Sequence, residues 1–183
     1  MNIHKLALAF SLLICVATEP SSAASVTEPQ YIGTIEAREL STGNYVLLER
    51  ATPEAHTSTT LFGIAGVSRD VSYPGEKSPV RFNAGQKVDF VIRVERQDQD
   101  PMTLIQFWSL APKDGKRVLP LWETGSVYNN NVNHTAMQHA VPFTVDKLGK
   151  NFFVFRASSP LPPGEYSLSA SNIADGYNFG IDP

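Results

Sequence analysis

The chain has 183 residues, a formal net charge of −3 and a single cysteine. It contains no cluster of basic residues, which argues against nucleic acid or an anionic membrane surface as a partner. Thirteen prolines and twelve glycines are spread among short apolar runs, and this composition favours an all-β fold.

The first 24 residues have the pattern of a secretory signal peptide. Lys5 precedes an apolar run over residues 6–17, and small residues over 21–24 supply a cleavage site. The run is too short to span a bilayer and no later stretch is longer, so we expect no transmembrane segment after cleavage. Cys15 lies inside this leader, so the mature chain is expected to lack cysteine and thiol chemistry. The pattern predicts secretion, to a bacterial periplasm.

Residues 25–77 are predicted to form a small N-terminal β-hairpin extension or subdomain. Two strands are expected over residues 31–36 and 45–49, joined by a polar turn. The threonine-rich stretch 52–60 predicts a loop. Residues 70–79 hold two turn-forming proline pairs and predict a linker to the main domain.

Residues 78–183 are predicted to form the main domain. The clearest strand covers residues 87–96, where charged side chains alternate with an inward-facing apolar set, Val88, Phe90, Ile92 and Val94. Further along, Asp114 and Gly115 predict a tight hairpin turn between two apolar strands.

A proline-rich turn near the C-terminus carries the most specific structural motif. Leu161, Pro163, Gly164 and Tyr166 stand in the order Leu-x-Pro-Gly-x-Tyr, directly before an alternating strand. This step resembles the tyrosine corner of Greek-key β-sandwiches, in which the tyrosine hydroxyl bonds back to the preceding loop. An ordinary turn before a strand is the alternative.

Seven or eight short strands from residue 78 onward, together with this corner, resemble an immunoglobulin-like or fibronectin-III-like sandwich. The segments 78–81, 90–94, 162–166 and 179–182 are also similar to a group of uncharacterised bacterial secreted proteins. That resemblance implies a sandwich with an N-terminal hairpin extension. It implies no activity, and no catalytic residue can be transferred from it.

The segment from His134 to His139 holds the strongest candidate for chemistry. Imidazole and thioether groups together suit copper, so His134, Met137 and His139 form a candidate copper site on a long loop. The alternative is a polar loop in which two histidines fall near a methionine by chance. No other cofactor is indicated.

Residues 125–138 form a long, asparagine-rich segment, and such loops are often functional. We therefore take this segment, with Trp122, Tyr128, Asn130 and Asn133, as a candidate binding surface. Stacking of its aromatic side chains on sugar rings is one alternative, and partial burial of the same rings is another.

Three functions follow from these features. The preferred hypothesis is a non-enzymatic binding module for an envelope or extracellular protein, through a strand edge or the long loop. The second is a periplasmic copper carrier. The third is a hydrolase, although the chain contains no Gly-x-Ser-x-Gly motif.

Overall fold

The computed structural model describes residues 29–60, 66–125, 131–170 and 175–183. The predicted signal peptide lies outside these residues, as do Cys15, Tyr128 and Asn130. In the described part of the chain, no helix is long and apolar enough to cross a membrane.

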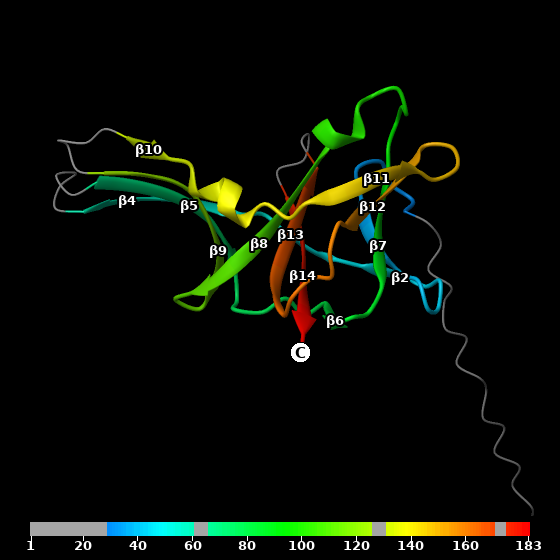
Figure 1. The fold of residues 1–183 in the computed structure, drawn as a ribbon, viewed down its shortest axis with the longest axis horizontal. Coiled ribbons are helices and arrows are strands. Elements are labelled where there is room, and N and C mark those ends of the chain that lie inside the picture. The colour runs from blue at the N-terminus through cyan, green and yellow to red at the C-terminus, as the bar shows by residue number, and fades with distance from the viewer. Residues whose placement is uncertain (1–28, 61–65, 126–130, 171–174) are drawn as a thin grey trace, which may run out of the picture.

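The protein is an all-β sandwich of two sheets whose strands are antiparallel apart from one parallel pair (Figure 1). The first sheet has the order β11 (Phe143–Lys147), β12 (Phe152–Ala157), β7 (Val88–Arg93), β1 (Ile35–Glu39) and β2 (Tyr45–Leu47). The second has the order β3 (Glu49–Ala51), β14 (Gly176–Asp182), β13 (Gly164–Ala170), β8 (Ile105–Lys113), β9 (Lys116–Thr124), β5 (Gly66–Pro74) and β4 (Glu54–Thr60). Two short strands join it at the side, β6 (Arg81–Asn83) on β14 and β10 (Val132–Asn133) on β9. The immunoglobulin-like connectivity stays a prediction.

Aromatic side chains from both sheets fill the space between them. Phe90 of the first sheet lies 4.9 Å from Phe179 of the second, measured between ring centroids, and stacks on Phe155 at 5.8 Å. Tyr166 also stacks on Phe179, at 5.4 Å between ring centroids. Burial of each such ring stabilises the fold by about 1.5–3 kcal/mol. The inward set predicted for β7 is confirmed, because all four of its apolar side chains pack in this cluster.

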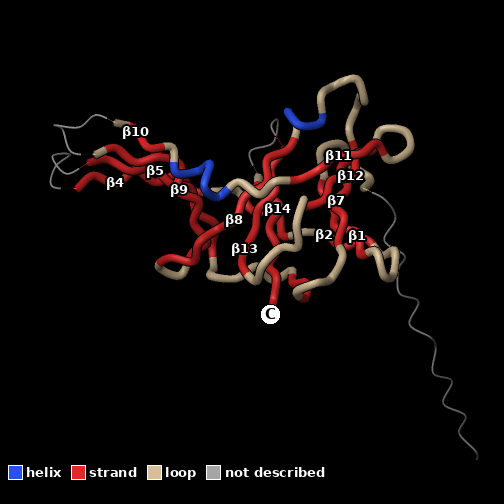
Figure 2. Tube along the Cα trace, in the orientation of Figure 1, coloured by secondary structure: helices blue, strands red, loops and turns tan. Residues whose placement is uncertain are grey.

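Part of the second sheet projects beyond the sandwich as a β-wing, which we define as β4, β5, β9 and β10 (Figures 1 and 2). A small second core at its base contains Tyr73, Leu110 and Leu119. Arg117 is fully buried there and donates to the Glu49 carboxylate at 2.5 and 2.8 Å and to the Pro74 backbone oxygen at 2.7 Å. The bonds to Glu49 attach the wing to β3, and the bond to Pro74 ties β9 to the end of β5.

The N-terminal third of the chain is part of both sheets. The predicted hairpin is present as β1 and β2, but β1 also pairs along its whole length with β7, near the middle of the first sheet. The predicted loop 52–60 and linker 70–79 are wrong. Most of the first stretch is strand β4 and the first half of the second is the end of strand β5, because their threonines and valines are good strand formers even where the pattern is polar. Residue 77 therefore marks no boundary in strand pairing.

The predicted tyrosine-corner hydrogen bond is present. Tyr166 lies in β13 and is buried, and its hydroxyl donates to the backbone oxygen of Pro162 at 2.7 Å. The turn holds Leu161 against the main core, while Pro163 is exposed and Gly164 begins the strand. The corner thereby fixes the loop that connects β12 to β13.

Candidate functional site

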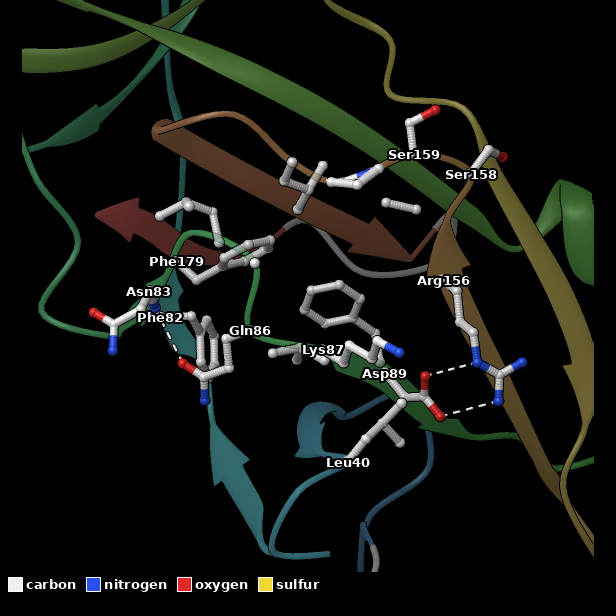
Figure 3. Close-up of a pocket in the computed structure, with 17 residues that line it drawn as sticks. Leu40, Phe82, Asn83, Gln86, Lys87, Asp89, Arg156, Ser158, Ser159 and Phe179 are labelled. Atoms are coloured by element: carbon white, nitrogen blue, oxygen red, sulfur yellow. Dashed lines mark hydrogen bonds and ion pairs between the residues drawn. The ribbon is translucent and has the colours of Figure 1, made fainter. Parts of the chain in front are cut away.

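A pocket of about 320 Å³ opens at one end of the sandwich, beside the tyrosine corner (Figure 3). Its lining comes from segments far apart in the sequence: the turn after β1, β6 with the turn that follows it, the start of β7, the end of β12 with the loop that follows it, and the end of β14. The volume is within the range of small-molecule sites, at its lower end.

The wall of the pocket is mainly apolar. Phe82, Phe90 and Phe179 reach it from the main core. Figure 3 shows the rings of Phe82 and Phe179 at its edge. Leu161, held in place by the tyrosine corner, forms another side. Leu40 borders the pocket with 46% of its surface exposed, so it offers apolar area that a ligand would cover.

The charged groups lie together on one side of the pocket, opposite Phe82 and Phe179 (Figure 3). Asp89 is 0% exposed although it projects from the outward face of β7. Arg156 binds it through two nitrogens, at 2.7 and 3.0 Å, and Arg38 binds it at 2.7 Å. The alternation along the strand correctly places Asp89 on the outward face, but two guanidinium groups from the neighbouring strands cover its carboxylate and bury it.

The arginines at this site are neutralised by their partners. Arg156 also donates to Asp146 at 2.7 Å, so two arginines face two carboxylates in one network across the first sheet. Hydrogen bonds to Asp89 are the main reason why the pKa of both guanidinium groups is raised. They remain charged and firmly paired at any physiological pH.

Lys87 is the remaining cation of the lining. It is exposed just before β7 and makes no salt bridge with the residues that the structure describes. Nearby, Gln86 donates to Glu39 at 3.1 Å, and the other oxygen of that carboxylate accepts from Thr42. Glu39 itself does not line the pocket. The charged side chains that do are Lys87, Arg156 and Asp89, so the lining has a net positive charge.

The predicted copper ligands lie elsewhere, around the 3₁₀-helix η3 (Thr135–His139). His134 precedes the helix and is exposed, Met137 is 70% exposed, and His139 is half-buried with Nδ1 3.5 Å from Ser109 Oγ. Residues two apart in a 3₁₀-helix project from different sides, which separates Met137 from His139. The described residues contain no cluster of three or more His, Cys, Asp or Glu suited to a metal ion. Copper binding stays a prediction.

The predicted binding surface is only partly within the described residues. Trp122 is half-buried on β9 of the wing, and Asn133 on β10 is exposed and donates to Glu123 at 3.2 Å. Tyr128 and Asn130 fall outside the described part of the chain. Neither Trp122 nor Asn133 lines the pocket beside the corner.

One serine–histidine pair has the distance of a catalytic dyad. Ser72 Oγ lies 2.9 Å from His56 Nε2, between β5 and β4. Ser72 is only 2% exposed, and the nearest carboxylate, Glu54, approaches the same ring nitrogen at 3.7 Å instead of orienting the opposite one. A hydrolytic dyad needs an accessible hydroxyl and an orienting acid on the far nitrogen, so this pair is better suited to holding the two strands together.

Comparisons with protein-family models, with curated proteins and with solved structures found no match. The function must therefore be argued from the residues and their geometry.

Proposed function

We propose that this chain is an exported, non-enzymatic binding module whose pocket takes an apolar chain that carries a negative charge at one end. The observation that carries the proposal is the pocket beside the tyrosine corner, with aromatic walls and Lys87 at its mouth. A well-formed apolar pocket with a few polar groups on one side is the usual form of a small-molecule site.

The two parts of the pocket define the ligand. Phe82, Phe90 and Phe179 offer an apolar wall, on which an alkyl chain gains free energy by leaving water. On the charged side, Arg156 is already neutralised by Asp89 and Asp146. Lys87 is therefore the cation that attracts the negative end of the ligand. Acyl chains with carboxylate or phosphate heads have this chemistry, and they occur in lipid envelopes.

The leader pattern of residues 1–24 supports export to a periplasm, where such lipids and their fragments are found. The burial of Ser72 supports a role in binding over one in hydrolysis. The earlier hypothesis of a protein-binding loop at 125–138 shares the same class, a binding module, but uses a different surface.

Calorimetric titration with three probes tests the proposal. Decanoate has the chain and the negative charge, decyltrimethylammonium has the chain with a positive charge, and propanoate has the charge with almost no chain. We expect saturable binding of one decanoate per protein, with much weaker binding of the other two. Equal binding of all three probes, or none of decanoate, contradicts the proposal.

Two variants locate the binding. Lys87→Glu reverses the charge at the mouth and is expected to weaken decanoate binding about threefold to tenfold, since one partly exposed ion pair is lost and a repulsion replaces it. Lys113→Glu makes the same charge change at the exposed end of β8 and should leave binding unchanged. Ala157→Leu enlarges a side chain of the pocket wall and should weaken binding of the chain itself.

A further inference from the structure

Edge strands in β-proteins normally carry a feature that prevents pairing with another chain, such as short length, a lysine, a proline or a bulge. In the first sheet, the edge strand β2 has three residues, while β11 follows Pro142 and ends in Asp146 and Lys147. In the second sheet, the edge strand β3 also has three residues. Each of these edges is protected.

The remaining long edge strand, β4, is less protected, although it too follows a proline, Pro53. It runs for seven residues, Glu54–Thr60, and all seven are exposed. It contains no lysine, proline or glycine, and its ladder with β5 is regular along its whole length. The bulge of the wing lies between β5 and β9, one strand further in, so it does not twist the outer edge away. The backbone groups on the outer side of β4 are therefore available to another strand.

We infer that β4 pairs antiparallel with β4 of a second copy of this chain, about a two-fold axis at Thr57. The position of the wing permits this, because it projects away from the sandwich and its edge is not covered by the rest of the described chain (Figure 1). The product is one continuous sheet through both copies.

The length of β4 favours this register, because a two-fold axis at its central residue pairs the whole strand. With the axis at Thr57, all seven residues find partners: His56 lies opposite Ser58, Ala55 opposite Thr59, and Glu54 opposite Thr60. No two like charges face each other, and the central pair is Thr–Thr, a favourable cross-strand pair. An axis moved by one residue in either direction pairs only five residues of the strand.

The dimer is expected to be reversible. A single pair of seven-residue strands makes a small interface, and small interfaces belong to transient complexes. Covalent trapping is therefore the sharpest test, and the chain is well suited to it because Cys15 is its only cysteine. Once the predicted leader is removed, a single introduced thiol therefore reports on one position, and in a chain that keeps the leader Cys15→Ser gives the same background.

Thr57→Cys is expected to form a disulfide-linked dimer under mild oxidation. Directly opposed residues in an antiparallel pair have Cα atoms about 4.5–5.5 Å apart, which is within reach of a disulfide. Thr60→Cys tests the register, because its two copies would lie about 20 Å apart along the paired strands and should not link. Thr144→Cys, on the protected edge β11, should not link either.

Sedimentation of the chain over a range of concentrations gives the second measurement. We expect the average mass to rise toward twice that of the monomer, and Thr57→Lys to abolish the rise by placing two lysines opposite each other. Thr144→Lys, the same change on β11, should leave it intact. The inference is overturned if Thr57→Cys links no better than Thr60→Cys, or if the mass stays that of a monomer at every concentration. If the protein stays monomeric but binds a peptide with the sequence of β4, the edge pairs with strands of other proteins and not with a second copy.

Discussion

The hydroxyl of Tyr166 offers the cleanest test of how the corner holds the fold. Its only hydrogen bond among the described residues is the one to the backbone oxygen of Pro162, at 2.7 Å, while its ring stacks on Phe179 in the core. Tyr166→Phe removes the hydroxyl and keeps the ring. Tyr166→Ala removes both, so the pair of variants separates the corner bond from the packing.

The magnitude follows from the two surroundings. A neutral hydrogen bond contributes about 0.5–1.5 kcal/mol net. Pro162 is exposed, so its carbonyl can bond to water once the hydroxyl is gone, and no buried acceptor remains unsatisfied. We therefore expect Tyr166→Phe to lower the free energy of unfolding by about 1 kcal/mol. Loss of the ring in Tyr166→Ala leaves a cavity beside Phe179, and the cost rises to about 3–5 kcal/mol.

Urea unfolding of the wild type and both variants measures these values, and an unchanged slope would show that the unfolded state is unaffected. Tyr31→Phe is the matched control, because Tyr31 is 73% exposed and should lose less than about 0.5 kcal/mol. If Tyr166→Phe costs no more than the control, the corner bond does not stabilise the fold. If Tyr166→Phe costs nearly as much as Tyr166→Ala, the hydrogen bond and the ring do not make the separate contributions assumed here.

Two further changes test buried charges. Glu36 is 5% exposed with one carboxylate oxygen unpartnered among the described residues, and burial raises its pKa, so the ionised form opposes folding at pH 7. Glu36→Gln should therefore raise the urea midpoint at pH 7. It should change the midpoint little at pH 4, where the wild-type carboxyl is largely protonated. An equal effect at both pH values would refute ionisation of Glu36 as the cause. Arg117→Met leaves Glu49 without its partner and should lower the free energy of unfolding by about 3 kcal/mol, as measured in a thermal melt. The control Lys116→Met breaks a surface ion pair and should cost less than about 1 kcal/mol. Similar losses for the two variants would show that the wing is held by other contacts.

Several elements could be predicted from the sequence because local chemistry determines them. The alternation along β7 gave the correct inward face, and Asp114 and Gly115 form the predicted turn between β8 and β9, both with positive φ. The Leu-x-Pro-Gly-x-Tyr step identified the corner. In each case the signal and the structure lie within a few consecutive residues.

The rest depends on contacts between segments far apart in the chain. Asp89 has the alternation of a solvent-facing residue, yet arginines from β1 and β12 bury it. β4 has a polar pattern that resembles a loop, because an edge strand needs no buried face. The pocket beside the corner combines residues from five segments, so no local motif announces it.

Chemical-shift mapping of the protein during titration with decanoate tests the central proposal most directly. We predict saturable shifts at the backbone amides of residues that line the pocket, Leu40, Lys87, Phe90 and Leu161 among them, with the amides of η3 and β4 unmoved. Shifts spread over the exposed apolar surface, or confined to residues 131–139, would contradict the pocket as the binding site.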